Sequence, residues 1–177
     1  MAETQNSPAL KVPFFKASVG RKEEEAVLRV LRSGWLTTGK EALAFEREFA
    51  DKVQASHALA VNSNTSGMVL AMEACGVGPG RAVITTPYTF VSTAACARLL
   101  GADVYFADIE HDSYSIDPAK IEEILKGPNG RKVAAIVPVH IGGNVCNMEA
   151  IMALARTYGV RVIEDAAHSF PSRTRLG

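Results

Sequence analysis

The sequence has no excess of charge of either sign, because 19 Lys and Arg residues balance 19 Asp and Glu residues. A nucleic acid or an anionic membrane surface as the main partner requires a basic excess, so neither is expected. Cysteine is also scarce. The three residues Cys75, Cys96 and Cys146 lie far apart and form no CxxC pair. This usage predicts buried free thiols and a reducing compartment rather than a disulfide framework.

Long apolar runs are missing as well. No stretch approaches the length of a membrane-spanning helix, and residues 1–8 are polar and contain no apolar signal core. The sequence therefore predicts a cytoplasmic protein without a membrane segment. Residues 1–12 are expected to form a flexible lead-in.

Several well-known site motifs are absent. The sequence contains no GxxxxGK[ST] phosphate loop and no GxSxG nucleophile turn. Its four histidines show no metal-ligand spacing, so no metal site is expected. The glycine-rich stretch at residues 76–80 follows a predicted helix and precedes a predicted strand, which is the reverse of a dinucleotide fingerprint. An unrelated nucleotide-binding domain is therefore the least favoured interpretation.

The pattern that is present alternates helix and strand through a chain of 177 residues, 47% of them hydrophobic. Short apolar runs predict strands at 58–61, 83–85, 104–107, 133–139 and 160–163. Amphipathic stretches and end signals predict helices at 20–33, 41–53, 65–74, 90–100, 118–125 and 147–158. This rhythm predicts an α/β fold for residues 13–177, with three α/β/α layers around a mostly parallel sheet.

Three loops leave the carboxyl ends of predicted strands, where parallel sheets bind ligands. In the first, Asn62–Gly67, the start of a helix leaves Thr65 and Ser66 able to bind a phosphate. The same residues suit ordinary helix capping, which is the commoner use. In the second, Phe90 can stack on a planar ring, although such a residue belongs more often to the core.

The third loop follows the strand at 160–163 and contains Glu164, Asp165 and His168. An acid at a strand end can meet a buried cation, but it can equally form a turn or a cap. Beside it, His140 can bind a ligand or play a structural role. Together, a phosphate-binding helix start, an aromatic ring and a carboxylate match three parts of pyridoxal 5′-phosphate (PLP): its phosphate, its planar ring and its ring nitrogen, which must stay protonated.

Five stretches, in order along the chain, resemble the DegT/StrS-type sugar aminotransferases. They are Ser33–Gly39, Ser63–Met68, Pro87–Thr93, Val137–His140 with Gly143, and Val162–Ser169. The resemblance implies part of the large domain of a PLP-dependent transferase of fold type I. It also implies nucleotide-linked keto-sugar substrates, glutamate as amino donor, a role in polysaccharide or deoxysugar biosynthesis, and a homodimer.

The resemblance implies roles for individual residues. Thr65 and Ser66 would hold the cofactor phosphate, Phe90 would stack on the pyridine ring, and Asp165 would pair with the ring nitrogen. His168 would lie near the 3′ oxygen, where many relatives carry glutamine. The implied substrate-binding residues are Trp35, Leu36, Thr37, Thr38 and His140.

One feature of the family is missing. Its catalytic lysine, which forms a Schiff base with the cofactor, follows Asp165 along the chain, whereas no lysine follows Lys132 in this sequence. The resemblance therefore implies that the catalytic lysine lies beyond Gly177, the last residue, and no residue of the sequence is assigned a catalytic role. We expect a truncated, N-terminal portion of the large domain, without the C-terminal small domain, that does not transaminate alone.

Two alternatives remain open. One is a PLP-dependent sugar dehydratase of the same family, in which histidine replaces the lysine. The position that separates the two enzymes is also expected beyond Gly177. The other is a non-catalytic α/β binding or interaction domain that keeps the fold without turnover.

Overall fold

The computed structural model describes residue 13 and residues 16–173. The expected lead-in at residues 1–12 lies outside the described residues. Gly177, beyond which the catalytic lysine is expected, also lies outside them, so the structure does not test that expectation. The chain divides into two compact units, one ending at Ala60 and the other beginning at Val61. Each unit is described by itself.

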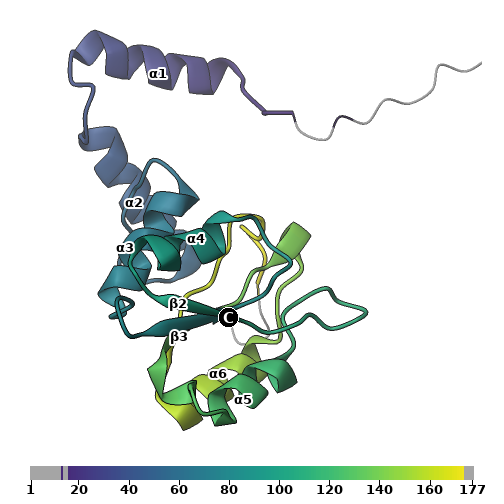
Figure 1. The fold of residues 1–177 in the computed structure, drawn as a ribbon. Helices are drawn as coiled ribbons and strands as arrows, with labels where there is room; N and C mark the ends of the chain where they lie inside the picture. The colour runs from purple at the N-terminus through teal and green to yellow at the C-terminus, as the bar shows by residue number, and fades with distance from the viewer. Residues whose placement is uncertain (1–12, 14–15, 174–177) are drawn as a thin grey trace, which may run out of the picture. The chain divides into compact units, whose positions relative to one another are not determined.

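The first unit contains two helices, α1 (Arg21–Ser33) and α2 (Lys40–Val53), close to the predicted bounds (Figure 1). At the start of α1, the backbone N–H of Gly20 donates to the Glu23 carboxylate at 2.8 Å. This bond lowers the pKa of Glu23. The helix ends at Gly34, whose φ of +72° is a conformation that glycine adopts without strain.

The predicted strand at 58–61 is wrong. These residues pair with no other strand in the described part of the chain. A strand needs a neighbour to bond its backbone groups. Here the N–H of Ala60 donates instead to the Glu46 carboxylate, at 2.9 Å. A short apolar run indicates that a segment could be buried in a sheet, but it does not predict whether another strand lies beside it.

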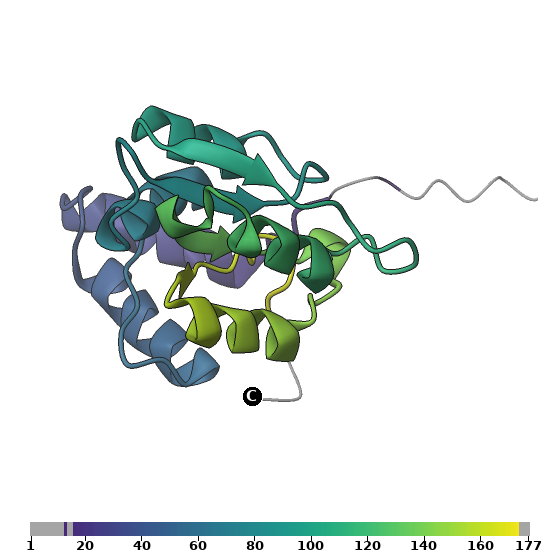
Figure 2. The ribbon, with the colours of Figure 1, turned by 60° about the horizontal axis from the view of Figure 1, so that its bottom comes forward.

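The second unit contains a four-stranded sheet in the order β2-β1-β3-β4, with every pair parallel (Figure 2). The strands are β1 (Ala82–Thr85), β2 (Asp103–Phe106), β3 (Val133–Val137) and β4 (Arg161–Val162). The helices are α3 (Asn64–Ala74), α4 (Ser92–Leu99), α5 (Pro118–Lys126) and α6 (Met148–Tyr158), with short 3-10 turns η1 (Gly130–Lys132) and η2 (Ile141–Gly143). The predicted α/β architecture is confirmed.

Helices cover both faces of the sheet, which gives the three layers. Figure 1 shows α4 on one side of the strands and α5 and α6 on the other. Val83, Ala135 and Val137 pack in one apolar cluster with residues of α3 and α4. Ile84 and Ile136 pack in the other cluster, with residues of α5 and α6. Neighbouring residues thus alternate between faces, as the pleat of a strand requires.

The helix ends follow their sequence signals. The Asp117 carboxylate accepts a hydrogen bond from the N–H of Ala119 at 2.8 Å, and Pro118 occupies the first turn of α5. Gly159 ends α6 with φ of +67°. In contrast, α4 begins at Ser92 rather than at the predicted Phe90, so residues 87–91 form a loop between β1 and α4.

The sheet order places a topological switch between its two central strands. From β1 the chain moves to β2 on one side, whereas β3 and β4 lie on the other. Loops that leave β1 and β3 therefore diverge, which opens a crevice at their carboxyl ends. Beyond Pro138, which has no N–H to donate, pairing resumes only as a parallel bridge between Val139 and Asp165.

Candidate functional site

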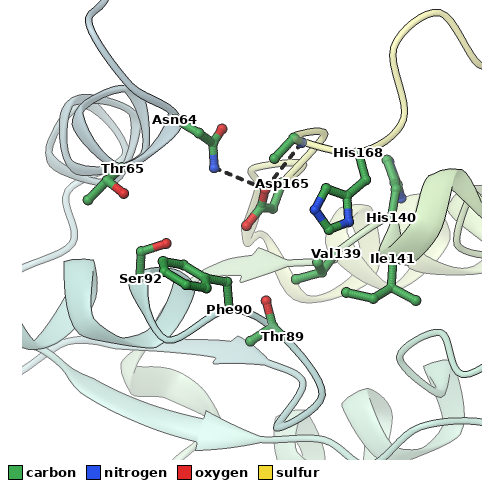
Figure 3. Close-up of a pocket in the computed structure, with 11 residues that line it drawn as sticks. Asn64, Thr65, Thr89, Phe90, Ser92, Val139, His140, Ile141, Asp165 and His168 are labelled. Atoms are coloured by element: carbon green, nitrogen blue, oxygen red, sulfur yellow. Dashed lines mark hydrogen bonds between the residues drawn. The ribbon is translucent and has the colours of Figure 1, made fainter. Parts of the chain in front are cut away.

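A pocket of about 500 Å³ lies at this crevice in the second unit (Figure 3). Its size is that of a small-molecule site. The lining residues come from the start of α3 and from the segments after β1, β3 and β4. They are Asn64, Thr65, Thr89, Phe90, Ser92, Val139, His140, Ile141, Asp165, Ala167 and His168. The predicted gathering of these loops at one sheet edge is confirmed.

The loop before α3 caps the helix and also contributes to the pocket. Ser63 Oγ accepts a hydrogen bond from the N–H of Ser66 at 3.2 Å, so Ser63 is the capping residue. The Ser66 hydroxyl donates to Asn62 Oδ1 at 2.7 Å. Thr65 lines the pocket, whereas Ser66 is not among the lining residues. The first N–H groups of a helix have no acceptor within the helix, so this end attracts anions.

Phe90 is not a core residue, because 72% of its surface is exposed. It follows β1 and contributes its ring to the pocket. The chain bends at residues 87–89, before α4 begins at Ser92. An exposed aromatic ring at a pocket wall can stack on a planar ligand.

Asp165 is buried, with 5% of its surface exposed, and its carboxylate has three donors. Asn64 Nδ2 donates to Oδ1 at 3.1 Å, and the N–H of Ala167 donates to the same oxygen at 3.3 Å. Thr93 Oγ1 donates to Oδ2 at 2.8 Å. Asp165 therefore presents a hydrogen-bonded carboxylate to the pocket.

Asp165 also affects the neighbouring Cys96. Burial of the Cys96 thiol, and next the charge of Asp165, raise the pKa of that thiol.

His168 also lines the pocket, and one of its ring nitrogens already has a partner. The N–H of Gly142 donates to His168 Nδ1 at 3.3 Å. Gly142 has a φ of +58°, a conformation that glycine adopts without strain. A nitrogen that accepts a hydrogen bond carries no proton, so in the neutral ring the hydrogen is on Nε2. His168 thus offers an N–H donor.

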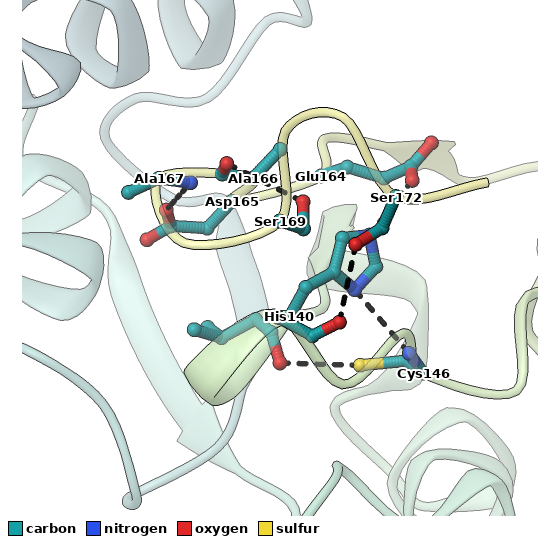
Figure 4. Close-up of polar contacts among 10 residues, drawn as sticks. His140, Cys146, Glu164, Asp165, Ala166, Ala167, Ser169 and Ser172 are labelled. Carbon is teal, nitrogen blue, oxygen red and sulfur yellow. Dashed lines mark hydrogen bonds and ion pairs between the residues drawn. The ribbon is translucent and has the colours of Figure 1, made fainter.

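His140 is 3% exposed and has partners at both ring nitrogens (Figure 4). Nε2 lies 2.9 Å from Glu164 Oε2, and the N–H of Cys146 donates to Nδ1 at 3.3 Å. Contacts with Cys146 and Glu164 raise the pKa of His140 to about 9, against burial. The N–H of Cys146 acts in the opposite direction, because it loses its acceptor when Nδ1 takes a proton. The Glu164 carboxylate, which lies 2.9 Å from Nε2, contributes to the raised pKa.

These contacts show what Glu164 and His140 do in the fold. The His140 ring joins the segment after β3 to the segment after β4 and to Cys146. His140 lines the pocket, but a ligand can bond its ring nitrogens only by displacing Glu164 or Cys146.

The loop of Trp35, Leu36, Thr37 and Thr38 belongs to the first unit. Trp35 Nε1 donates to the Thr38 carbonyl at 2.9 Å, and 65% of the side chain is exposed. A Cβ at Gly39 would lie 2.7 Å from Trp35 Cδ1, so a larger residue there would displace the Trp35 side chain. The substrate-binding role of this loop stays a prediction.

Sequence patterns missed three polar residues of the site. They are Asn64 and Thr93, which bond Asp165, and Thr89, whose hydroxyl lies 2.8 Å from that of Thr93. Asn64 and Thr93 stand 101 and 72 positions away from Asp165. For Thr89 and Thr93 the local signal was the hydroxyl-rich composition of residues 85–93.

Residues 13 and 16–173 contain no group of three or more His, Cys, Asp or Glu side chains arranged to hold a metal ion. Within the same residues, no helix has the length and apolar character needed to span a membrane.

Known proteins resemble this chain over most of its length. Spore coat polysaccharide biosynthesis protein SpsC from Bacillus subtilis is 45% identical over 158 residues, which are 89% of this chain and 40% of that relative. The solved aminotransferase from Psychrobacter cryohalolentis is 35% identical, with a TM-score of 0.83, over 90% of this chain and 40% of that one. The PMP form of the putative sugar aminotransferase Spr1654 from Streptococcus pneumoniae is 25% identical, with a TM-score of 0.82. The match covers 90% of this chain and 43% of that one.

The chain thus spans about 40% of the length of the curated relative. The model of the DegT/DnrJ/EryC1/StrS aminotransferase family matches residues 17–175. That match includes parts of both units and every residue of the pocket. The chain belongs to the DegT/DnrJ/EryC1/StrS aminotransferase family.

Proposed function

We propose that this chain supplies the cofactor-binding part of a PLP-dependent aminotransferase that acts on a nucleotide-linked keto-sugar, with glutamate as amino donor. The observation that carries the proposal is the pocket in which Asp165, Phe90 and the start of α3 meet. Family membership and the resemblance to a polysaccharide biosynthesis protein support the sugar substrate and a role in polysaccharide or deoxysugar biosynthesis.

The donor set of the pocket fits PLP. The carboxylate of Asp165 has three donors for its four acceptor positions, so it can accept one more hydrogen bond, from a protonated ring nitrogen. Phe90 offers its exposed ring to the pyridine face. Thr65 stands at a helix start that attracts a phosphate. When bound, PLP supplies an electron sink for amino-group chemistry.

Two further residues complete the proposed set. His168 would donate its Nε2 hydrogen to the 3′ oxygen, because Gly142 occupies Nδ1. Ser66 would contact the phosphate only after releasing its bonds to Asn62 and Ser63, so Thr65 is the main phosphate ligand of the two.

Substrate binding is proposed for His140 and for the loop of Trp35, Leu36, Thr37 and Thr38. Trp35 is the only tryptophan in the sequence, so its fluorescence reports on this loop alone. Binding of a nucleotide-sugar is expected to change that fluorescence, whereas the Trp35→Phe variant should give no signal. An unchanged emission with bound ligand would remove the loop from the substrate site.

We further propose that the 177-residue chain does not transaminate by itself and that the active protein is a homodimer. The pocket lining in the described part of the chain contains no lysine. The lysines of the second unit lie on α5 and η1, and the catalytic lysine of the family is proposed to follow Gly177. Transfer of amino groups from glutamate to a keto-sugar by the purified chain would contradict the first point. A stable monomer in light scattering at high concentration would count against the second.

A cofactor titration tests the proposal directly. The purified protein is titrated with PLP and followed by absorbance, with pyridoxal and inorganic phosphate as competitors. Phe90→Leu is expected to weaken binding by about 2- to 10-fold, the value of one aromatic contact. The matched control is Phe106→Leu on β2, which changes another exposed phenylalanine outside the pocket. Equal affinities for the two variants would contradict the site.

Borohydride reduction of the full-length protein with its cofactor separates the two enzyme classes. Reduction leaves the cofactor covalently attached if a lysine holds it, as in an aminotransferase. In a dehydratase with histidine at that position the cofactor dissociates. A full-length protein that does not bind PLP would favour a non-catalytic α/β binding or interaction domain.

A further inference from the structure

The two oxygens of Asp165 are not equivalent. Oδ1 accepts hydrogen bonds from Asn64 Nδ2 and from the N–H of Ala167, which use both of its acceptor positions. Oδ2 accepts one bond, from the Thr93 hydroxyl at 2.8 Å. The carboxylate of Asp165 points into the space that Asn64, Phe90 and His168 surround in Figure 3. A ligand N–H that binds Asp165 must therefore share Oδ2 with Thr93.

The hydroxyl of Thr93 has a fixed direction when Asp165 is ionised. A carboxylate only accepts, so Thr93 donates its single proton to Oδ2. The hydroxyl of Thr89, 2.8 Å away, must then donate to Thr93. Thr89 in this way holds the Thr93 hydroxyl in the orientation that bonds Asp165.

Burial distinguishes Thr93 from Asn64. Thr93 has no exposed surface, whereas Asn64 is an exposed residue whose amide competes with water. A hydrogen bond to a charged group is stronger away from water. The bond from Thr93 therefore controls the orientation of the carboxylate more than the bond from Asn64 does.

We propose that Thr93, held by Thr89, is a positioning residue that turns Asp165 so that the remaining acceptor position of Oδ2 meets the ring nitrogen of the cofactor. This inference rests on the proposed function, because it assumes that PLP is the ligand of Asp165. The Thr93 side chain itself does not line the pocket. It acts through Asp165.

The first experiment needs no cofactor. Crystal structures of the parent protein, Thr93→Val and Thr93→Ser are compared without ligand. Valine keeps the shape of threonine and removes the hydroxyl, whereas serine keeps the hydroxyl. The Asp165 carboxylate is expected to rotate in the valine variant and to keep its parent orientation in the serine variant. An unchanged carboxylate in Thr93→Val overturns the proposal.

The second experiment uses PLP as the probe. In Thr93→Val, PLP affinity is expected to fall about tenfold, and the ring nitrogen is expected to lose its proton at a lower pH, seen in the absorbance of bound PLP. Serine should restore both values. A purely structural role for Thr93 would lower stability without moving this pH, and that result would overturn the proposal.

Thr85→Val is the matched control. Thr85 is also fully buried, and its hydroxyl donates to the Val137 carbonyl at 2.9 Å, within the sheet. It should leave the spectrum of bound PLP unchanged. If Thr93→Val does not fold, Thr89→Val removes the support of the same hydroxyl and should shift the same pH in the same direction. If the parent protein does not bind PLP, the proposed function fails, and the carboxylate orientation in the crystal structures still decides the role of Thr93.

Discussion

Replacing Asp165 by asparagine removes one negative charge and changes little else in shape. The variant keeps an oxygen that can accept from Asn64 and Ala167. Its amide group, however, cannot accept the proton of Thr93, because an NH₂ group only donates. The substitution therefore tests the charge and the acceptor at Oδ2 without changing the volume of the side chain.

The expected loss of PLP affinity follows from the distance and the medium. Opposite charges about 4 Å apart attract by about 1 kcal/mol in water and by about 4 kcal/mol at the effective dielectric of a protein surface. The pocket is partly open to solvent while Asp165 itself is buried, so the attraction lies between these limits. Affinity should fall by a factor between about 5 and about 1000.

The assay is a PLP titration at constant ionic strength, with urea unfolding as a second measurement. The free energy of unfolding should fall by about 1–3 kcal/mol, because the buried Thr93 hydroxyl loses its acceptor. Asp103→Asn is the matched control for charge. Asp103 begins β2 at the other end of the strands, 55% of its side chain is exposed, and it pairs with Arg98. Such an exposed pair contributes about 0–1 kcal/mol.

The control should bind PLP as the parent does. If the Asp165→Asn and Asp103→Asn variants both retain the parent affinity, Asp165 is not the partner of the ring nitrogen. A loss of affinity in both variants would show that net charge, rather than the position of the carboxylate, governs binding.

Three further variants test the fold and the His140 cluster. Ile84→Ala should lower the free energy of unfolding by about 2–5 kcal/mol in urea, since Ile84 is fully buried on a central strand; a loss below about 1 kcal/mol would contradict its place in the core. Asp117→Ala should cost about 0.5–2 kcal/mol in the same assay, because the N–H of Ala119 loses its cap; an unchanged midpoint would contradict the cap. Glu164→Gln should lower the pKa of His140 in an NMR titration. Because the pKa of His140 is higher in the folded state than the unfolded value of 6.5, its protonation stabilises the fold fully below pH 6.5, and this contribution is lost as pH rises through the folded pKa. The variant should therefore lose stability mainly on the acid side.

Local signals in the sequence predicted the elements and most of their ends. Asp117 with Pro118 marks the start of α5, and Gly34 and Gly159 mark the ends of α1 and α6. Each of these signals acts within a few residues, through one hydrogen bond or one backbone angle. The predicted strand at 58–61 failed because a strand depends on a partner elsewhere in the chain.

The candidate site was predictable only in part, for the same reason. Position at a strand end made Asp165, Phe90 and His140 candidates for the pocket, and all three line it. Contacts between side chains depend on how the loops fold toward one another. Asn64 and Thr93 could not be assigned to Asp165 from periodicity or spacing, because hydrogen bonds across 101 and 72 positions leave no local pattern.

The two side chains that donate to Asp165 occupy similar positions in their helices. Asn64 is the first residue of α3 and Thr93 is the second residue of α4, so both donors come from helix N-terminal turns. Such turns carry unpaired N–H groups and the positive end of the helix dipole. The two helices pack in the same apolar cluster on one face of the sheet, which brings their first turns to the same edge. That edge therefore favours negative charge, and the fold can place a fixed anion, Asp165, near a helix start that attracts a ligand anion.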